Sequence, residues 1–189
     1  MSRKAIISTS VAPIYKEPSF LSEMVTQALI WEYIYILEES GNWVYVLMED
    51  GYNGWLNSFY FCQSKFSLSN FEYIHNRIAP VYRKLNKVDT IISILSFGSR
   101  IPICEKIDKW YKIYLPDGEF AYMDSQKSLH TYNRESIIAL AKSLQGIPYL
   151  WGGKSSFGYD CSGFVQMVLK VAGIPLQRDT DLQSQTKKL

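Results

Sequence analysis

The chain has 189 residues, of which 47% are hydrophobic and 20% charged, so it can bury a core and is not a disordered polypeptide. Its formal net charge of +2 excludes a strong overall attraction to nucleic acid or to anionic membranes. The three cysteines show neither a C-x-x-C pair nor Cys/His metal spacing, which argues against a disulfide scaffold and a structural zinc site.

The N-terminal run MSRKAIISTSVAP contains too short an apolar stretch for a secretory signal peptide. No apolar stretch of the sequence reaches the length of a membrane span. We therefore expect a cytoplasmic protein, or a periplasmic or secreted one if a leader has been removed.

An internal repeat organises the first two thirds of the chain. Residues 12–15 (APIY) recur as residues 79–82 (APVY). At the same offset, further landmarks coincide: Ile34 with Ile101, Ile36 with Ile103, Glu38 with Glu105, Trp43 with Trp110, and Asp50-Gly51 with Asp117-Gly118. One offset shared by all of these positions predicts a duplication.

Each copy is expected to form short antiparallel strands, because β-forming side chains precede the two Asp-Gly turn signals. Pro102 should restrict its strand to an edge or a bulge. The segments Gly41 to Val46 and Asp50 to Trp55 resemble bacterial SH3-like domains, although the second copy has Asp108 in place of Gly41. The resemblance implies two small β-barrels, residues 1–66 and 67–130, because closure removes exposed strand edges.

From Arg134 onward the hydrophobic period becomes helical. Asn133 and Ser136 can cap a first helix, and Gly146 should end it. After an aromatic loop, residues 148–159, a second helix is expected, with an apolar stripe formed by Phe164, Val165, Val168, Leu169 and Ala172.

Cys161 is expected at the N-terminus of this second helix. Unpaired backbone N–H groups and the helix dipole favour a thiolate there and can stabilise an oxyanion. For a lone cysteine, a buried structural role would be the better interpretation. The residues around Cys161 favour a nucleophile instead.

Residues 146–166, GIPYLWGGKSSFGYDCSGFVQ, resemble the signature of the NlpC/p60 cysteine peptidases, bacterial enzymes that cut peptidoglycan stem peptides. Residues 173–183, GIPLQRDTDLQ, are similar to a second family motif, with Gln177 where proline is usual. The expected fold class is therefore multidomain α+β: two small SH3-like β-barrels followed by the helical N-terminal half of a papain-like domain in residues 131–189.

The resemblance also implies a site and a reaction. Cys161 is the nucleophile, and Asp160 and Thr180 hold the ammonium of a murein peptide, although Asp160 can also cap the helix. The implied reaction is hydrolysis of a γ-D-glutamyl bond to a diamino acid, in peptides with a free N-terminal L-Ala and without a cofactor or metal. The implied substrate-binding residues are Asp160, Ser162, Tyr149, Thr180, Trp151 and Tyr60.

Thiolate–imidazole chemistry needs a histidine, which the family carries after the cysteine helix. The two histidines of this chain, His75 and His130, precede Cys161 and fall in two expected linkers, residues 63–76 and 124–133, where a solvated role is favoured. We therefore expect a C-terminal truncation that removes the sheet with the base. The apolar stripe of the cysteine helix would then face water, and the chain alone would be inactive or very weak.

Two other functions remain open at this point. The two SH3-like barrels could bind cell-wall peptide or glycan without catalysis, and the same Cys/His fold could transfer acyl groups. The sequence makes no prediction about the oligomeric state.

Overall fold

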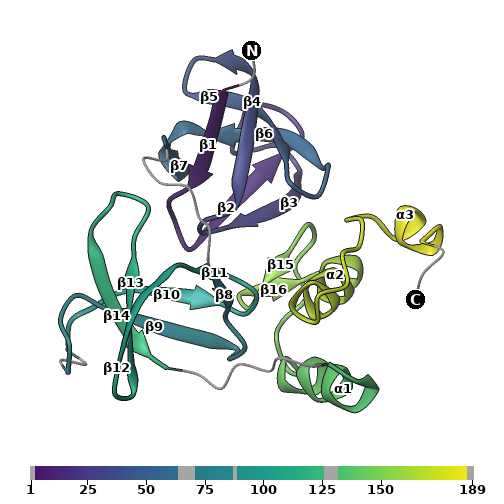
Figure 1. Cartoon of the computed structure of the whole chain (residues 1–189). Coiled ribbons are helices and arrows are strands. Elements are labelled where there is room, and N and C mark those ends of the chain that lie inside the picture. The colour runs from purple at the N-terminus through teal and green to yellow at the C-terminus, as the bar shows by residue number, and fades with distance from the viewer. Residues whose placement is uncertain (1–2, 64–70, 87–88, 126–131, 187–189) are drawn as a thin grey trace.

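The computed structural model describes residues 3–63, 71–86, 89–125 and 132–186. It has three parts: a first β-unit (3–63), a second β-unit (71–125) and a C-terminal segment (132–186) that contains the α-helices (Figure 1). The boundaries expected at residues 66 and 130, much of both expected linkers and His130 lie outside the described residues. Within the described ranges, no helix is long and apolar enough to span a membrane.

The first β-unit is one antiparallel sheet of seven strands, in the order β3-β2-β6-β5-β4-β1-β7. Its alternating side chains bury a core around Ile14, Ile34 and Val46. The strands are β1 (Arg3–Ile7), β2 (Val11–Tyr15), β3 (Met24–Leu29), β4 (Tyr33–Ser40), β5 (Trp43–Met48), β6 (Asn53–Asn57) and β7 (Phe61–Cys62), with a 3-10 turn at Ser58–Tyr60.

The second β-unit repeats this strand order. Its larger sheet runs β10-β9-β14-β13-β12, which follows the path β3-β2-β6-β5-β4 of the first unit, and a short pair, β11-β8, completes it. The sequence repeat therefore corresponds to a repeated topology. The strands are β8 (Glu72–Tyr73), β9 (Ile78–Tyr82), β10 (Ile91–Ser96), β11 (Arg100–Ile101), β12 (Ile103–Ile107), β13 (Trp110–Tyr114) and β14 (Phe120–Asp124).

Two local features show how the second copy tolerates its substitutions. Asp108 adopts the left-handed backbone conformation of its counterpart Gly41, with φ of +51° against +58°, and aspartate is among the residues that enter this region most readily. Pro102 separates β11 from β12, and β12 is an edge strand of its sheet. This outcome confirms the edge position predicted from the missing N–H of proline.

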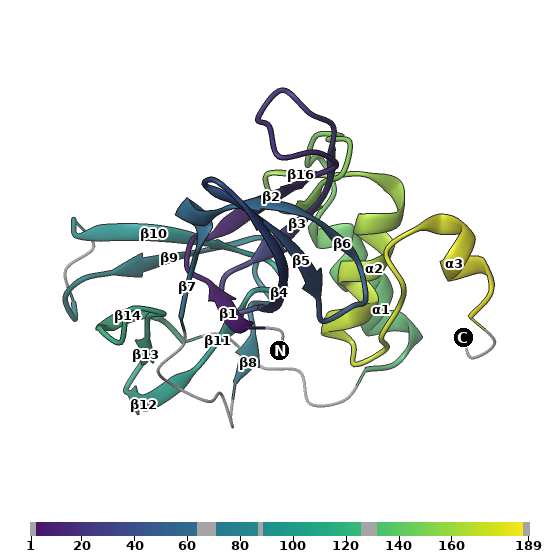
Figure 2. The ribbon, with the colours of Figure 1, turned by 90° about the horizontal axis from the view of Figure 1, so that it is seen from above.

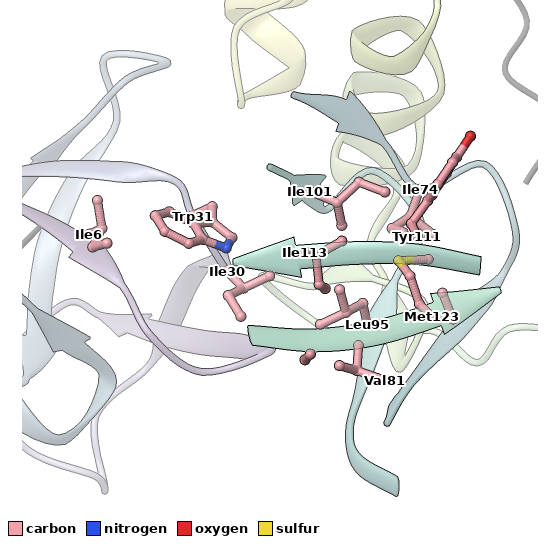
Figure 3. Close-up of a cluster of buried hydrophobic side chains, with 12 residues drawn as sticks. Ile6, Ile30, Trp31, Ile74, Val81, Leu95, Ile101, Tyr111, Ile113 and Met123 are labelled. Atoms are coloured by element: carbon pink, nitrogen blue, oxygen red, sulfur yellow. The ribbon is translucent and has the colours of Figure 1, made fainter. Parts of the chain in front are cut away.

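The two β-units share one hydrophobic cluster. Ile30 and Trp31, in the turn before β4, extend from the first unit toward Leu95 and Ile113 of the second unit (Figure 3). The Trp31 side chain is almost fully buried there. The units therefore pack through a continuous core.

The C-terminal segment begins as the sequence predicts. Asn133 and Ser136 form a reciprocal capping box at the start of the first helix, and Gly146 has a φ of +87° just beyond its end. The elements are α1 (Arg134–Ser143), the short strands β15 (Lys154–Ser155) and β16 (Gly158–Tyr159), α2 (Cys161–Val171) and α3 (Thr180–Ser184).

The buried face of α2 differs from the expected stripe. Met167, which the stripe omitted, is fully buried, whereas Val165, which it included, is 40% exposed. Met167 packs in a cluster with Leu29 of the first β-unit and Phe97 of the second. The helices lie on one side of the β-units (Figure 2). The expectation that the apolar face of this helix is open to water is therefore wrong for its inner side, because both β-units cover it.

Buried charges also join the three parts. The Lys154 Nζ, on a side chain only 2% exposed, lies 3.4 Å from the Glu32 carboxylate and 3.5 Å from the Asp50 carboxylate. Lys170 on α2 pairs with the other Glu32 oxygen. Burial by itself would raise the pKa of Glu32, but the charges of the two lysines outweigh burial and hold that pKa well below its usual range.

Replacement of Met167 by alanine should lower the free energy of unfolding by about 2–5 kcal/mol, because it opens a cavity among well-packed neighbours. The matched variant Val165→Ala should change this quantity by less than about 0.5 kcal/mol, since Val165 faces solvent. Urea unfolding of both variants measures the difference. Equal losses would contradict the packing of α2 against both β-units.

Replacement of Glu32 by glutamine should destabilise the protein by about 3–5 kcal/mol, because Lys154 loses a partner in a buried position. In the native protein, the stability from Glu32 is present above its unfolded-state pKa near 4.5 and declines as the pH falls below that value. The variant should lack this part of the acid sensitivity, as measured by thermal unfolding between about pH 3 and 7. Glu39→Gln, which breaks only the exposed pair with Arg3, is the control and should have little effect.

Candidate functional site

A cavity of about 320 Å³ opens at the N-terminus of α2. Three stretches that are distant in the sequence form its wall: the first β-unit, the loop before α2 and the segment around the start of α3. The lining residues are Glu23, Val25 and Tyr52; Tyr149, Trp151, Gly152, Asp160, Cys161 and Ser162; and Arg178, Asp179, Thr180 and Asp181.

Most of the residues expected at the site lie around this cavity. Cys161 is there together with Asp160, Ser162, Tyr149, Thr180 and Trp151. Tyr60 is not among the lining residues: its ring lies 5.2 Å from that of Phe59 and packs against the core of the first β-unit. The tyrosine that the first β-unit contributes to the cavity is Tyr52, which follows the Asp50-Gly51 turn.

Cys161 is exposed and occupies the first position of α2. Asp160 precedes it as the N-cap, and its Oδ1 accepts a hydrogen bond of 2.7 Å from the backbone N–H of Gly163. Cys161 therefore lies at the positive end of the helix dipole, where the first N–H groups have no partner within the helix. This arrangement suits a sulfur nucleophile and the oxyanion that its attack would create.

Arg178 is the main site residue that the sequence analysis did not single out. Its guanidinium is almost fully buried and holds the Asp160 carboxylate at both oxygens, at 3.0 Å and 2.6 Å. The same group donates to Ser162 Oγ at 2.8 Å and to Thr26 Oγ1 on β3 at 2.9 Å. A bound ammonium would therefore meet Asp160 as a carboxylate that is already paired.

The lining of the cavity also includes three further acidic residues. Glu23, Asp179 and Asp181 line it, and Glu23 accepts a hydrogen bond of 2.9 Å from the indole N–H of Trp151. Burial raises the pKa of Tyr52, and the negative charge of Asp179 raises it further. With Asp160 neutralised by Arg178, the surplus negative charge favours a cationic ligand group.

Sequence reasoning could have found some of these residues. Arg178 and Asp179 stand within the second motif, residues 173–183, so a signal for both was present. For Glu23 and Tyr52 the family resemblance implied only acidic and tyrosine residues somewhere in the first copy; their positions had no signal, because they lie in the repeat more than a hundred residues before Cys161 and reach the cavity only through folding.

No histidine of the described residues lines the cavity. His75 is half-buried, its Nδ1 lies 3.3 Å from the Tyr132 hydroxyl, and the two rings are stacked. His75 is therefore only partly exposed and contacts Tyr132, while His130 lies outside the described ranges.

The loop before Cys161 docks closely against β3. Gly152 has a φ of +71°, and a Cβ at this position would lie 2.4 Å from the backbone oxygen of Met24. The next contact along the loop is a hydrogen bond of 2.9 Å from the Lys154 N–H to the Gln27 side chain. Glycine is required at position 152 by both its conformation and the close approach of the two backbones.

Gly152→Ala should therefore displace the cysteine loop and lower the free energy of unfolding more than Gly146→Ala. Both substitutions place a Cβ on a residue in the left-handed backbone conformation, which costs about 1–2 kcal/mol of stability. Only position 152 adds a backbone clash, worth about 1–3 kcal/mol, since a Cβ on Gly146 meets nothing within 4 Å. Thermal unfolding of the two variants checks this, and equal destabilisation would argue against docking of the loop on β3.

Comparison with known proteins identifies two parts of the chain. Residues 14–58 match the family described as "Bacterial dipeptidyl-peptidase Sh3 domain", which confirms an SH3-like domain in the first copy of the repeat. Residues 146–189 match the family described as "NlpC/P60 family".

Curated relatives extend over more of the chain. "Dipeptidyl-peptidase 6" of Lysinibacillus sphaericus is 30% identical over 203 residues, which cover 93% of this chain and 72% of the relative. "Gamma-D-glutamyl-L-lysine dipeptidyl-peptidase" of Bacillus cereus is 28% identical over 86% of this chain, and the protein of the same name from Bacillus subtilis is 29% identical over 86%. The chain spans only 55% and 58% of the lengths of these two proteins.

A solved structure shows the same fold. The crystal structure of an NlpC/P60 family protein from Bacillus cereus superposes with a TM-score of 0.86 at 24% identity, covering 97% of this chain and 77% of that protein. The fold, the match of residues 146–189 and a relative covered over 72% of its length lead to one conclusion. The chain belongs to the NlpC/P60 family.

Proposed function

We propose that this chain carries the nucleophile and the substrate pocket of a cysteine peptidase that acts on peptidoglycan stem peptides. The proposed bond is the γ-D-glutamyl bond to a diamino acid, in peptides with a free N-terminal L-Ala. The observation that carries the proposal is the exposed Cys161 at the N-terminus of α2, beside an acidic cavity that the first β-unit closes.

In the proposed reaction, the Cys161 sulfur attacks the γ-glutamyl carbonyl carbon. The diamino acid leaves as an amine that takes up the thiol proton, and water then hydrolyses the thioester. The N–H groups at the start of α2 are suited to stabilise the negative oxygen of the tetrahedral intermediate. No metal or cofactor enters these steps.

The charges of the cavity support a peptide with a free amine. Glu23, Asp179 and Asp181 offer carboxylates to an ammonium group, and Tyr52 adds a hydroxyl. The names of two relatives, which specify a γ-D-glutamyl-L-lysine dipeptidyl-peptidase, agree with this choice of substrate.

The catalytic base is the group that the cavity lacks among the described residues. His75 is engaged with Tyr132 and does not line the cavity. We therefore propose that the 189-residue chain binds the peptide but turns it over very slowly, because none of the described residues places an imidazole in the cavity to accept the Cys161 proton.

Binding can be measured by calorimetry with the Cys161→Ala chain and the peptide L-Ala-γ-D-Glu-L-Lys. The same peptide with an acetylated amine should bind at least roughly tenfold more weakly, because the ammonium–carboxylate attraction is lost. Glu23→Gln should also weaken binding, whereas Tyr60→Phe, outside the cavity, should not. Equal affinity for the free and acetylated peptides would contradict the ammonium site.

Turnover is followed in the same system by the release of L-lysine. The unmodified chain should release no more lysine than the Cys161→Ala chain. A release that depends on Cys161 would contradict the proposed lack of a base while supporting the nucleophile.

A further inference from the structure

Arg178 makes more contacts than a helix cap requires. The Asp160 carboxylate already caps α2 through the Gly163 N–H, without help from an arginine. Arg178 nevertheless holds both oxygens of that carboxylate, and its side chain is only 2% exposed. Burial of a guanidinium is costly unless its N–H groups are paired, and here its three partners, Asp160, Ser162 and Thr26, lie on two segments, the start of α2 and β3.

The hydrogen bonds of the Arg178 guanidinium run in fixed directions. The Arg178 Nε donates to Thr26 Oγ1 on β3, while Nη1 and Nη2 point to Asp160, and Nη1 also reaches Ser162 Oγ. Because the guanidinium is planar and its donors are fixed in one fork, satisfying all of them sets the distance between β3 and the start of α2. A lysine could supply the positive charge, but its ammonium group could not donate hydrogen bonds in this fixed planar arrangement.

Asp160 is adjacent to Cys161 in the chain, so its charge acts on the thiol. An unpaired carboxylate in the same cavity as the thiol would disfavour a thiolate, whereas a carboxylate paired with a guanidinium has little net effect. The other titratable groups that line the cavity with Cys161 are Glu23 and Tyr52 from the first β-unit, Tyr149 from the preceding loop, and Asp179 and Asp181 at α3. Arg178 is the single cation among the described lining residues.

We propose that Arg178 is a positioning residue that fixes the Cys161 loop to the first β-unit and masks the Asp160 carboxylate from the thiol. The proposal rests on the nucleophilic role proposed for Cys161. In this proposal Arg178, the arginine of the second motif, affects the reactivity of the thiol through Asp160 and does not act on the substrate.

The test is the pH dependence of Cys161 alkylation by iodoacetamide, read by mass spectrometry of the modified peptides. Arg178→Gln should shift the midpoint of the Cys161 profile upward by about one pH unit, which is roughly a tenfold loss of rate near neutral pH. Arg178→Lys should shift it less. The exposed Cys104 on β12 serves as the internal reference, and its profile should not move.

A second substitution separates charge masking from general damage to the fold. Adding Asp160→Asn to Arg178→Gln removes the unmasked carboxylate, so the double variant should recover most of the unsubstituted profile. An unchanged midpoint in Arg178→Gln, or no recovery in the double variant, would overturn the proposal.

If Arg178→Gln does not fold, Arg178→Lys and Thr26→Val decide the question. Arg178→Lys should still raise the midpoint, and Thr26→Val, which removes only the Nε contact, should leave the masking of Asp160 and hence the midpoint in place. A normal midpoint in Arg178→Lys would then overturn the proposal. Alkylation needs no peptide turnover, so failure to bind the stem peptide counts against the proposed function alone.

Discussion

Burial of one face of α2 between the two β-units holds the site together. Met167 on this helix contacts a cluster that includes Leu29 from the first unit and Phe97 from the second. A short helix does not keep its conformation in water by propensity alone, so its stability comes from this packing. The position of Cys161 at the start of α2 is therefore a consequence of contacts made almost two turns further along the helix.

Buried cations make this hydrophobic contact specific for one placement of the C-terminal segment. Lys154, just before the cysteine helix, pairs with Glu32, and Arg178, after it, donates to Thr26. Both partners belong to the first β-unit, and both cations are almost completely shielded from water. Since a buried charge is costly without its partner, the two pairs discriminate against other placements of the segment. The cavity at Cys161 lies between the first unit, which supplies part of its wall, and the C-terminal segment that these contacts hold against it.

Much of the local structure followed from the sequence, and the long-range structure did not. The capping box at Asn133, the N-cap at Asp160 and the edge strand after Pro102 were predictable because each depends on a few neighbouring residues. The inner face of α2 was predicted only in part: Val168 and Phe164 of the expected stripe belong to the packed cluster, but Met167 was missed, because helical spacing cannot tell which of several apolar sides meets a partner. Tyr60 was chosen from the right unit, but Tyr52, in the turn between β5 and β6, lines the cavity instead.

The sequence by itself determined the duplication, the helix that begins at Cys161 and the family, because these depend on residues close together or on recurring patterns. Tertiary structure alone decided which side chains share the cavity with Cys161. Glu23 and Arg178 are separated by most of the chain, and their placement depends on how three units pack. It also decided that Asp160 is a paired carboxylate, since the arginine that neutralises it follows α2 in the chain and meets Asp160 only once the segment has folded. Packing and charge pairing between distant segments leave no local signature, and they set the chemistry of this site.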